Sequence, residues 1–292
     1  MSDGEGAAGV SAVDRRFVTF TRGPVAGSRI ESRQDQFQRL LREARDDPQI
    51  IGLVLTGSRG KGFGSDASDF DVLLVVQPEA LQAYRTKFSE DQAWEGFDWW
   101  VTSLPELEPV AAAWGEPLAW EILCNERYSF SDVSVLLDKT GQVQRLVEEK
   151  GGIPEERRLP IVVTALDAYI NSVYRSLKCL RNGNGLGARL EAADAIGHAL
   201  TVVFALEGRH RPYYGYLARE LEAHPLASFP LPADELLAML SAILESADAG
   251  TQQRLLGIID TLGRQAGCGE VFDEWESDYV WMQQYRPPNA TP

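Results

Sequence analysis

Two aspartates separated by a single residue, Asp69 and Asp71, stand at the start of an apolar run. Successive side chains of a strand point to opposite faces, so these two aspartates would share one face while Phe70 points into a core. Two carboxylates this close repel each other unless a divalent cation binds between them, and Mg²⁺ prefers oxygen ligands together with substrate phosphates. The spacing therefore favours a magnesium site that also binds a nucleotide.

The elements that would position these carboxylates are two strands, predicted over residues 50–56 and 69–76 from their branched apolar residues. A turn that starts with Gly57-Ser58 and is rich in glycine joins them, and its backbone N–H groups and hydroxyl can hold phosphates. A Walker A loop would need a lysine directly after Gly62, and no Gly-x-Gly-x-x-Gly opens a helix. The turn is thus a different phosphate-binding device.

The combination resembles the nucleotidyltransferase superfamily typified by DNA polymerase beta, whose pattern is an apolar strand, Gly-Ser, a gap of about ten residues and Asp-x-Asp entering a second strand. Four residues match that pattern: Gly57, Ser58, Asp69 and Asp71. The turn and the helical second half look most like the small-molecule branch, the aminoglycoside nucleotidyltransferases and their bacterial relatives. The resemblance covers about residues 30–220 and is strong only over residues 50–76.

This resemblance implies transfer of a nucleoside monophosphate, usually AMP from ATP, to an acceptor hydroxyl with release of pyrophosphate. Asp69 and Asp71 would ligate two Mg²⁺ ions. Family members use a third carboxylate on a later strand, for which Asp98 is the best match, either as a metal ligand or as the proton acceptor. They often place a lysine of the helical half on the triphosphate, and Lys178, or failing that Arg175, fits this role. Gly57 and Ser58 would contact the phosphates.

Several residues allow more than one interpretation. Asp-x-Asp alone is common on surface turns, and Asp98 could cap an edge strand. Arg59 and Lys61 are either solvated loop charges or phosphate ligands. Tryptophans around the third strand could line an acceptor pocket, although core packing is the more usual role of large aromatics. A stripe that could bind a cationic acceptor consists of Glu191, Asp194 and His198. The segment Arg209–Tyr214 resembles a helix entry and receives no role.

The chain as a whole is expected to be an α+β protein. A leader over residues 1–27 precedes a mixed-sheet nucleotidyltransferase domain over residues 28–150, and a helical bundle over residues 151–292 follows. Within the first domain a helix over residues 31–47 ends before Pro48, and two later strands are predicted over residues 97–104 and 133–137. The active site would lie in the cleft between the two domains.

Composition narrows the class of partner. The chain has 28 Lys and Arg against 43 Asp and Glu, a formal charge of −15, and both halves are acidic. Such a balance argues against extended nucleic-acid binding, which depends on cations that displace counterions from phosphates. Three cysteines without a Cys-x-x-Cys pair indicate no disulfide framework or structural zinc. No apolar run approaches the roughly 18 residues of a membrane span, so a cytoplasmic protein is expected.

The function expected from these residues is Mg²⁺-dependent nucleotidylation of a small hydroxylated acceptor, with a nucleoside triphosphate as the second substrate. A cationic acceptor such as a polyamine sugar would be attracted by the net negative charge. Two alternatives remain open. One is a toxin-like nucleotidyltransferase that modifies a protein or tRNA, and the other is a member of the fold that binds nucleotides without turnover.

Overall fold

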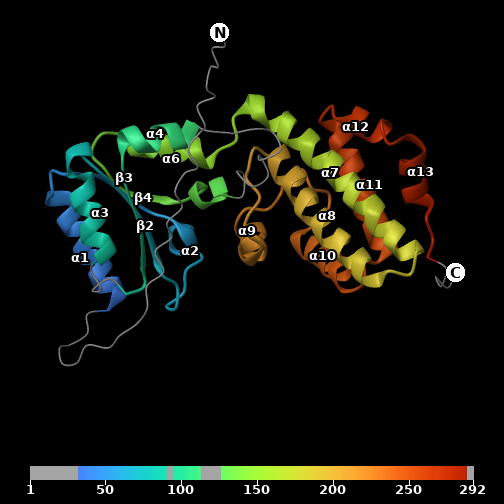
Figure 1. Ribbon diagram of the computed structural model, residues 1–292, viewed down its shortest axis with the longest axis horizontal. Coiled ribbons are helices and arrows are strands. Elements are labelled where there is room, and N and C mark those ends of the chain that lie inside the picture. Colours follow the sequence, from blue (N-terminus) through green and yellow to red (C-terminus); the bar gives the residue numbers. More distant parts are fainter. Residues whose placement is uncertain (1–31, 91–94, 113–125, 288–292) are drawn as a thin grey trace, which may run out of the picture.

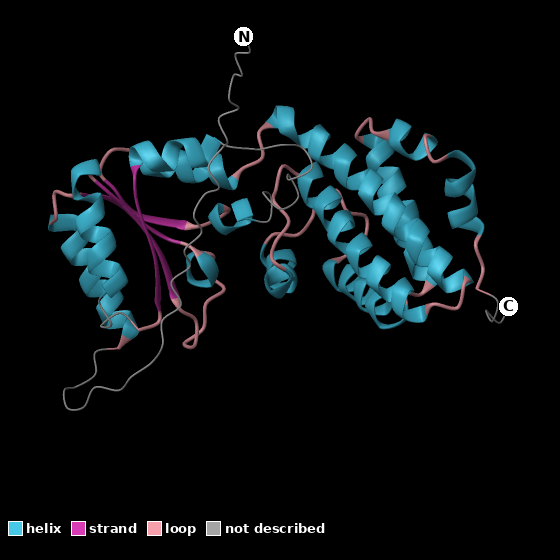
Figure 2. Cartoon of the chain, viewed as in Figure 1, coloured by secondary structure: helices cyan, strands magenta, loops and turns pink. Residues whose placement is uncertain are grey.

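The computed structural model describes residues 32–90, 95–112 and 126–287, which form two lobes side by side (Figure 1). The lobe over residues 33–151 contains the β-sheet and is called the sheet lobe. In the other, the helical lobe over residues 155–284, the described residues form helices and connecting segments (Figure 2). The expected α+β class, with a mixed sheet followed by helices, is confirmed. The leader over residues 1–27 lies outside the described residues.

The sheet has the strand order β3-β2-β1-β4, and β1 is antiparallel to both of its neighbours while β2 and β3 are parallel. Its strands are β1 (Ile50–Leu55), β2 (Phe70–Val76), β3 (Phe97–Ser103) and β4 (Ser134–Asp138). All four strands lie within two residues of their predicted bounds. β2 and β3 are parallel to each other, and β2 is antiparallel to β1. Both β2 and β3 therefore begin at the end of the sheet where β1 ends.

Helices cover both faces of the sheet. One face packs against α1 (Arg33–Asp46) and α3 (Leu81–Glu90), and the other packs against α4 (Leu104–Ala112) and α6 (Gln142–Gly151). The alternation along β2 follows this arrangement: Phe70, Val72, Leu74 and Val76 belong to the first core, and Leu73 and Val75 to the second. Asp71 therefore points toward the face that carries α4 and α6.

Local sequence explains where α1 begins and ends and where α8, the second helix of a long hairpin, begins. The Ser32 hydroxyl accepts a hydrogen bond from the Asp35 backbone N–H at 3.1 Å and caps α1, which stops before Pro48 as predicted. In the helical lobe, α7 (Glu155–Arg181) and α8 (Gly185–Leu206) form a hairpin. Asn184 caps α8, because its side chain accepts from the Gly187 N–H at 2.9 Å.

The remaining helices of the helical lobe pack around this hairpin (Figure 1). They are α9 (Leu217–Ala223), α10 (Ala233–Ser246), α11 (Ala249–Gln265), α12 (Gly269–Asp273) and α13 (Glu276–Gln284). Buried residues from Ile153 to Tyr285 form one apolar cluster, whereas those from Phe37 to Val147 form the two clusters on the sheet faces. The division into folding units near residue 150 stays a prediction.

The two lobes meet along a seam. Its sheet-lobe side consists of the Gly57–Gly64 turn and the short helix η4 (Tyr128–Phe130), and its helical-lobe side consists of residues 209–223 with η5 (Tyr214–Tyr216). The Tyr128 hydroxyl donates to Glu220 Oε2 at 2.7 Å, and the Arg219 guanidinium donates to the Phe63 carbonyl oxygen. These bonds tie η4 and the turn after β1 to α9.

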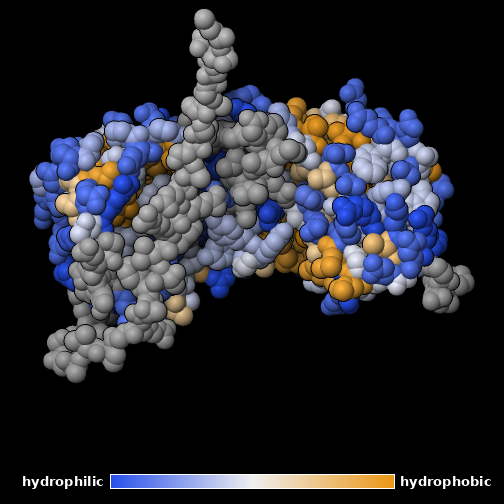
Figure 3. Space-filling view, in the orientation of Figure 1, coloured by the Kyte–Doolittle hydropathy of each residue, from blue (hydrophilic) through white to orange (hydrophobic). Residues whose placement is uncertain are grey.

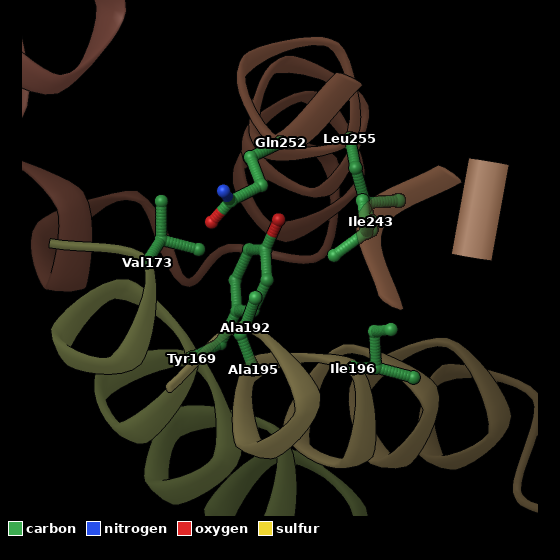
Figure 4. Close-up of a pocket in the computed structure, with 8 residues that line it drawn as sticks. All are labelled: Tyr169, Val173, Ala192, Ala195, Ile196, Ile243, Gln252 and Leu255. Atoms are coloured by element: carbon green, nitrogen blue, oxygen red, sulfur yellow. The ribbon is translucent and has the colours of Figure 1, made fainter. Parts of the chain in front are cut away.

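A small cavity lies inside the helical lobe (Figure 4). Its volume is about 10 Å³, and it is lined by Tyr169, Val173, Ala192, Ala195, Ile196, Ile243, Gln252 and Leu255. The Tyr169 hydroxyl and the Gln252 side-chain oxygen have no hydrogen-bond partner among the described residues. A volume of this size holds about one water molecule, so the cavity is too small for a nucleotide or a sugar.

Hydrophilic residues cover most of the coloured face of both lobes in Figure 3, which agrees with the large negative charge of the chain. Across the part of the chain that the structure describes, no helix combines the length and the apolar character needed to cross a membrane.

Candidate active site

The turn after β1 is built around Gly57, the first residue of the one-turn helix α2 (Gly57–Gly60). Just before it, the backbone N–H and the hydroxyl of Thr56 donate to the Asp71 carbonyl oxygen at 2.8 and 3.2 Å. Gly57 then takes a φ of +57°, a left-handed value that favours glycine. A Cβ atom at this position would lie 1.9 Å from Oδ2 of Asp71. The Asp71 carboxylate can lie against the turn only because residue 57 has no side chain.

Three aspartates gather at the sheet edge beside this turn. Asp71 and Asp98 are register partners on the parallel strands β2 and β3, and Asp69 directly precedes β2. Asp71 is partly buried, whereas Asp98 and Asp69 are exposed. Asp69 also forms an ion pair with Arg33, in which Nη1 and Oδ1 are 3.4 Å apart. The structure thus brings together the three carboxylates that the sequence selected.

Phe70 fixes the strand between the two aspartates of the Asp-x-Asp motif. Its side chain is 1% exposed, and its ring stacks between Phe37 and Phe97 with centroid separations of 4.7 and 4.9 Å. This buried stack holds Phe70 on the α1 side of the sheet, so that Asp71 is directed to the opposite side.

Burial and mutual repulsion disfavour the charged forms of these carboxylates. Burial raises the pKa of Asp71 to about 6, and the negative charges of Asp98 and Asp69 add to the shift. The pKa of Asp98 is also raised, first by burial and then by Asp69. A bound cation would remove the repulsion, which makes this group of oxygen ligands suitable for Mg²⁺. The residues present therefore fit the metal that the sequence implies.

The spacing of the aspartates is wider than that of a closed cage around one ion. Among the described residues, three potential ligands with atoms all within 4.8 Å of one another occur elsewhere, at Asp132, Glu220 and His224. In that second group, Glu220 already accepts hydrogen bonds from Tyr128 and Arg209, each at 2.7 Å. At the aspartates, metal binding would require the carboxylates to turn toward the ion.

The helical lobe contributes Tyr213 to the surroundings of this site, although no role is predicted for this residue from the sequence. Burial raises the pKa of Tyr213, and the Asp71 carboxylate is among the charges that raise it further. The ring is 37% exposed and meets the Tyr128 ring edge-on, with centroids 5.4 Å apart. Only the fold brings residue 213 close to residue 71, and the sole signal in the sequence is a Tyr-Tyr pair after Pro212.

Arg59 and Lys61, whose roles the sequence left open, both bond to the protein itself. Arg59 donates to the carbonyl oxygens of Ser68 and Ser65 at 3.0 and 2.9 Å, and so shapes the loop between β1 and β2. The Lys61 ammonium donates to the Ser131 carbonyl oxygen and lies 3.9 Å from the centroid of the Tyr128 ring. Neither residue is a freely solvated loop charge.

The two described tryptophans of β3 have different surroundings. Trp99 belongs to the core, where its ring stacks on Phe88 with a centroid separation of 4.0 Å. Trp100 points to the other face of the sheet, the face of Asp98, and remains 36% exposed while it packs edge-on against Phe130 at 5.6 Å. Core packing is therefore the role of Trp99 alone, and Trp100 is available to a ligand at the carboxylates.

The expected triphosphate ligand in the helical half is not brought to the site. Lys178 lies in the last turn of α7, the end of that helix remote from the sheet (Figure 1), and its ammonium rests 4.7 Å from the centroid of the Tyr174 ring. Its substitute, Arg175, pairs with Glu191 at 2.9 Å. The prediction for Lys178 is corrected because periodicity identifies a polar face of a helix but not the distance along the axis, which increases by about 1.5 Å per residue.

No protein-family model matches the chain, and no curated protein is significantly similar to it. Among solved structures, the chain is similar to a nucleotidyltransferase-like protein from Exiguobacterium sibiricum, with 13% sequence identity. The match covers 89% of this chain and 81% of the other, with a TM-score of 0.39. A likeness at this level carries no argument about function.

Proposed function

We propose that the protein is a Mg²⁺-dependent nucleotidyltransferase that moves a nucleoside monophosphate, AMP from ATP in the first instance, to a hydroxyl of a small acceptor. The observation that carries this proposal is the contact between the turn and the carboxylates. Gly57 lies directly against Asp71, and Asp71 is in register with Asp98. Phosphate-binding backbone and metal-binding carboxylates would therefore act on the same group of a bound nucleotide.

Each residue has a role that its position supports. Asp69, Asp71 and Asp98 would hold Mg²⁺, which supplies neutralisation of the triphosphate charge when it is bound. The backbone of Gly57 and the hydroxyl of Ser58 would contact the outer phosphates. Among the described residues the Ser58 side chain has no hydrogen-bond partner, so its hydroxyl is available for such a contact.

The transfer itself is a displacement at the α-phosphorus. The acceptor oxygen forms a bond to phosphorus, the bond to the bridging oxygen breaks, and pyrophosphate leaves with the electron pair. The proton of the acceptor hydroxyl would pass to a carboxylate of the same group, and Asp98 is the candidate where it does not itself hold the metal. Alignment and charge neutralisation dominate such reactions, so no covalent nucleophile is needed.

A direct test is the release of pyrophosphate from each of the four nucleoside triphosphates in the presence of Mg²⁺ and a panel of hydroxylated small molecules. The proposal expects acceptor-dependent release and a mass gain of one nucleoside monophosphate on the acceptor. Label that appears instead on protein or tRNA would favour the toxin-like alternative. Nucleotide binding without release for any acceptor would favour the non-catalytic alternative.

A further inference from the structure

A group of basic side chains lies at the seam between the lobes, in a chain whose net charge is strongly negative. This basic cluster consists of Lys61, Arg127, Lys150 and His210. Arg127 and His210 are each 2% exposed, and both lysines are partly buried. Lys61 belongs to the turn after β1, Lys150 to the last turn of α6, and His210 to the helical lobe. The cluster therefore draws on both lobes.

The cluster is held by aromatic rings and backbone oxygens. The Lys61 and Lys150 ammonium groups lie over the rings of Tyr128 and Phe130, with nitrogen-to-centroid distances of 3.9 and 4.9 Å. Arg127 donates to the Glu149 carbonyl oxygen at 2.7 Å, and His210 Nε2 lies 3.1 Å from the Gly152 carbonyl oxygen. Within the described residues, no carboxylate forms an ion pair with either lysine.

Burial disfavours the charged forms of the two lysines. Burial lowers the pKa of both Lys61 and Lys150 to about 8, and Arg127 lowers that of Lys150 further. Three carboxylates oppose the shifts: Glu220 and Asp132 at Lys61, and Glu126 at Lys150. Burial and the charges of Arg127, Lys150 and Lys61 lower the pKa of His210 to about 3, so its imidazole is neutral at pH 7.

The basic cluster adjoins the candidate active site along two chains of contacts. Trp100, on the same strand face as Asp98, packs against Phe130, over whose ring Lys150 lies. Tyr213, whose pKa the charge of Asp71 helps to raise, packs edge-on against Tyr128, over whose ring Lys61 lies. A ligand that reaches from the carboxylates across these aromatic rings would therefore meet the lysines.

We propose that the basic cluster is a second ligand site, in which Lys61 and Lys150 bind a phosphate or carboxylate anion that belongs to the substrate of the proposed transferase. The inference rests on the proposed function, and it concerns a different part of the substrate from the one that Asp69, Asp71 and Asp98 act on. Charge-assisted hydrogen bonds to a lysine are stronger where the lysine is shielded from water, and both lysines are partly buried at the seam.

A local anion site is compatible with an acidic protein. Salt screens charges over about 8 Å at physiological ionic strength, so a group at the seam responds to the nearby charges more than to the total of −15. These nearby charges are the cations Lys61, Arg127 and Lys150 and the carboxylates Glu126, Asp132 and Glu220. An acceptor with an anionic substituent would therefore be retained here, although the net charge alone suggests a cationic one. The other source of such an anion is the phosphate chain of the nucleotide.

The existence of the site is tested by calorimetric binding of inorganic phosphate and pyrophosphate to the full chain, at low ionic strength and without divalent metal. Binding is expected for the wild type, and it should be about tenfold weaker in Lys150→Met and in Lys61→Met, since each removes one charged hydrogen bond. It should also weaken as pH rises from 7 to about 9, because the lysines lose their protons. Lys87→Met is a matched control: Lys87 also lies over aromatic rings, at 5.6 Å from Tyr84 and 5.3 Å from Phe88, but on α3.

Absence of binding by the wild type, or equal binding by Lys150→Met and the wild type, would overturn the inference. Loss of binding through misfolding is recognised from the melting temperature. Met keeps the apolar stem of either partly buried lysine and removes a charge that burial disfavours, so the melting temperature should change little. A weakened anion affinity at normal stability is then a local effect.

The source of the anion follows from the binding of Mg²⁺-ATP to the same variants. If Lys150→Met weakens the binding of ATP as much as the binding of pyrophosphate, the cluster binds the nucleotide phosphates. If the binding of ATP is unchanged, the anion belongs to the acceptor. Asp69→Asn/Asp71→Asn separates this inference from the proposed function. That double variant should lose metal-dependent ATP binding and keep metal-free pyrophosphate binding, so either result can fail without the other.

Discussion

Gly57 and Asp71 are packed so closely that the glycine has no room for a side chain, since a Cβ atom would lie 1.9 Å from the carboxylate oxygen Oδ2. The two residues belong to different elements, the turn after β1 and the strand β2, which are also joined by the hydrogen bonds of Thr56 to the Asp71 carbonyl oxygen. Turn and carboxylate therefore form one unit, and a change in either should disturb both.

Gly57→Ala is expected to weaken Mg²⁺-ATP binding by about tenfold or more and to lower the free energy of unfolding by about 1 to 3 kcal/mol. The added methyl group must displace the Asp71 carboxylate, and the left-handed φ of +57° adds backbone strain. Calorimetry and urea unfolding measure the two effects.

Gly62→Ala is the matched control for Gly57→Ala. Gly62 also has a positive φ, +76°, but a Cβ atom there would have nothing within 4 Å. This variant should show only the cost of the left-handed backbone, about 1 kcal/mol, with unchanged nucleotide binding. Equal effects of the two substitutions on binding would contradict the importance of the contact with Asp71.

Asp71→Asn is expected to stabilise the metal-free protein at pH 7.5 by about 1 kcal/mol, a value reduced for solvent screening at this partly exposed group. The folded-state pKa of about 6 lies above the ordinary value of 3.8, so the folded state binds more protons between these values. The free energy of unfolding of the wild type therefore falls as pH rises from about 4 through about 6. Asn cannot ionise and avoids this loss.

Urea unfolding at several pH values measures the difference between wild type and Asp71→Asn. It should vanish near pH 4, where Asp71 is protonated in the folded state. Mg²⁺ with ATP should reverse the order at pH 7.5, because only the wild type retains the metal ligand. A variant less stable than the wild type in metal-free buffer at pH 7.5 would refute the raised pKa of Asp71, which burial and the neighbouring carboxylates produce.

Tyr213→Ala is expected to lower the rate of nucleotidyl transfer by about tenfold or more without a large loss of stability. Tyr213 belongs to the helical lobe, packs against Tyr128 of the sheet lobe and responds to the charge of Asp71, so its removal would admit water between the lobes. Tyr214→Ala is the control, since that neighbouring ring is 61% exposed and packs with Arg211. Steady-state kinetics measure the two rates. Equal losses of rate in Tyr213→Ala and Tyr214→Ala would show that Tyr213 has no role of its own at the site.

The cavity in the helical lobe is expected to contain one ordered water molecule. The Tyr169 hydroxyl and the Gln252 side-chain oxygen line a space of about 10 Å³, and two buried polar groups without a partner are costly. A high-resolution crystal structure would show this water within hydrogen-bond distance of both atoms. An empty cavity in well-ordered density would disprove the expectation.

Sequence patterns located the strands and carboxylates because these depend on local chemistry. The short, branched apolar runs of Ile50–Leu55 and Phe70–Val76 favour buried strands, and alternation along a strand then decides which face receives Asp71. Asp98 was selected by resemblance, and its register with Asp71 is a property of strand pairing that the sequence does not display.

The residues that the helical lobe brings near the site cannot be predicted from the sequence, because their positions depend on how the two lobes meet. Tyr213 comes near Asp71, and Lys61 comes near Glu220, only through contacts between residues far apart in the chain. Lys178 was wrongly selected for the opposite reason: it has the right type and lies on a polar helix face, but it lies at the remote end of α7. Neither residue type nor helical periodicity shows how far along the helix axis a residue lies from the sheet.

Calorimetric binding of ATP, GTP, CTP and UTP with and without Mg²⁺, to the wild type, Asp71→Asn and Asp66→Asn, tests the metal-nucleotide site most directly. Asp66 is an exposed aspartate of the same loop and serves as the control. A metal-nucleotide site at the carboxylates predicts Mg²⁺-dependent binding of at least one nucleotide to the wild type and to Asp66→Asn, and its loss in Asp71→Asn. Binding that is independent of Mg²⁺, or that Asp71→Asn retains at wild-type affinity, would contradict a metal-nucleotide site at these carboxylates.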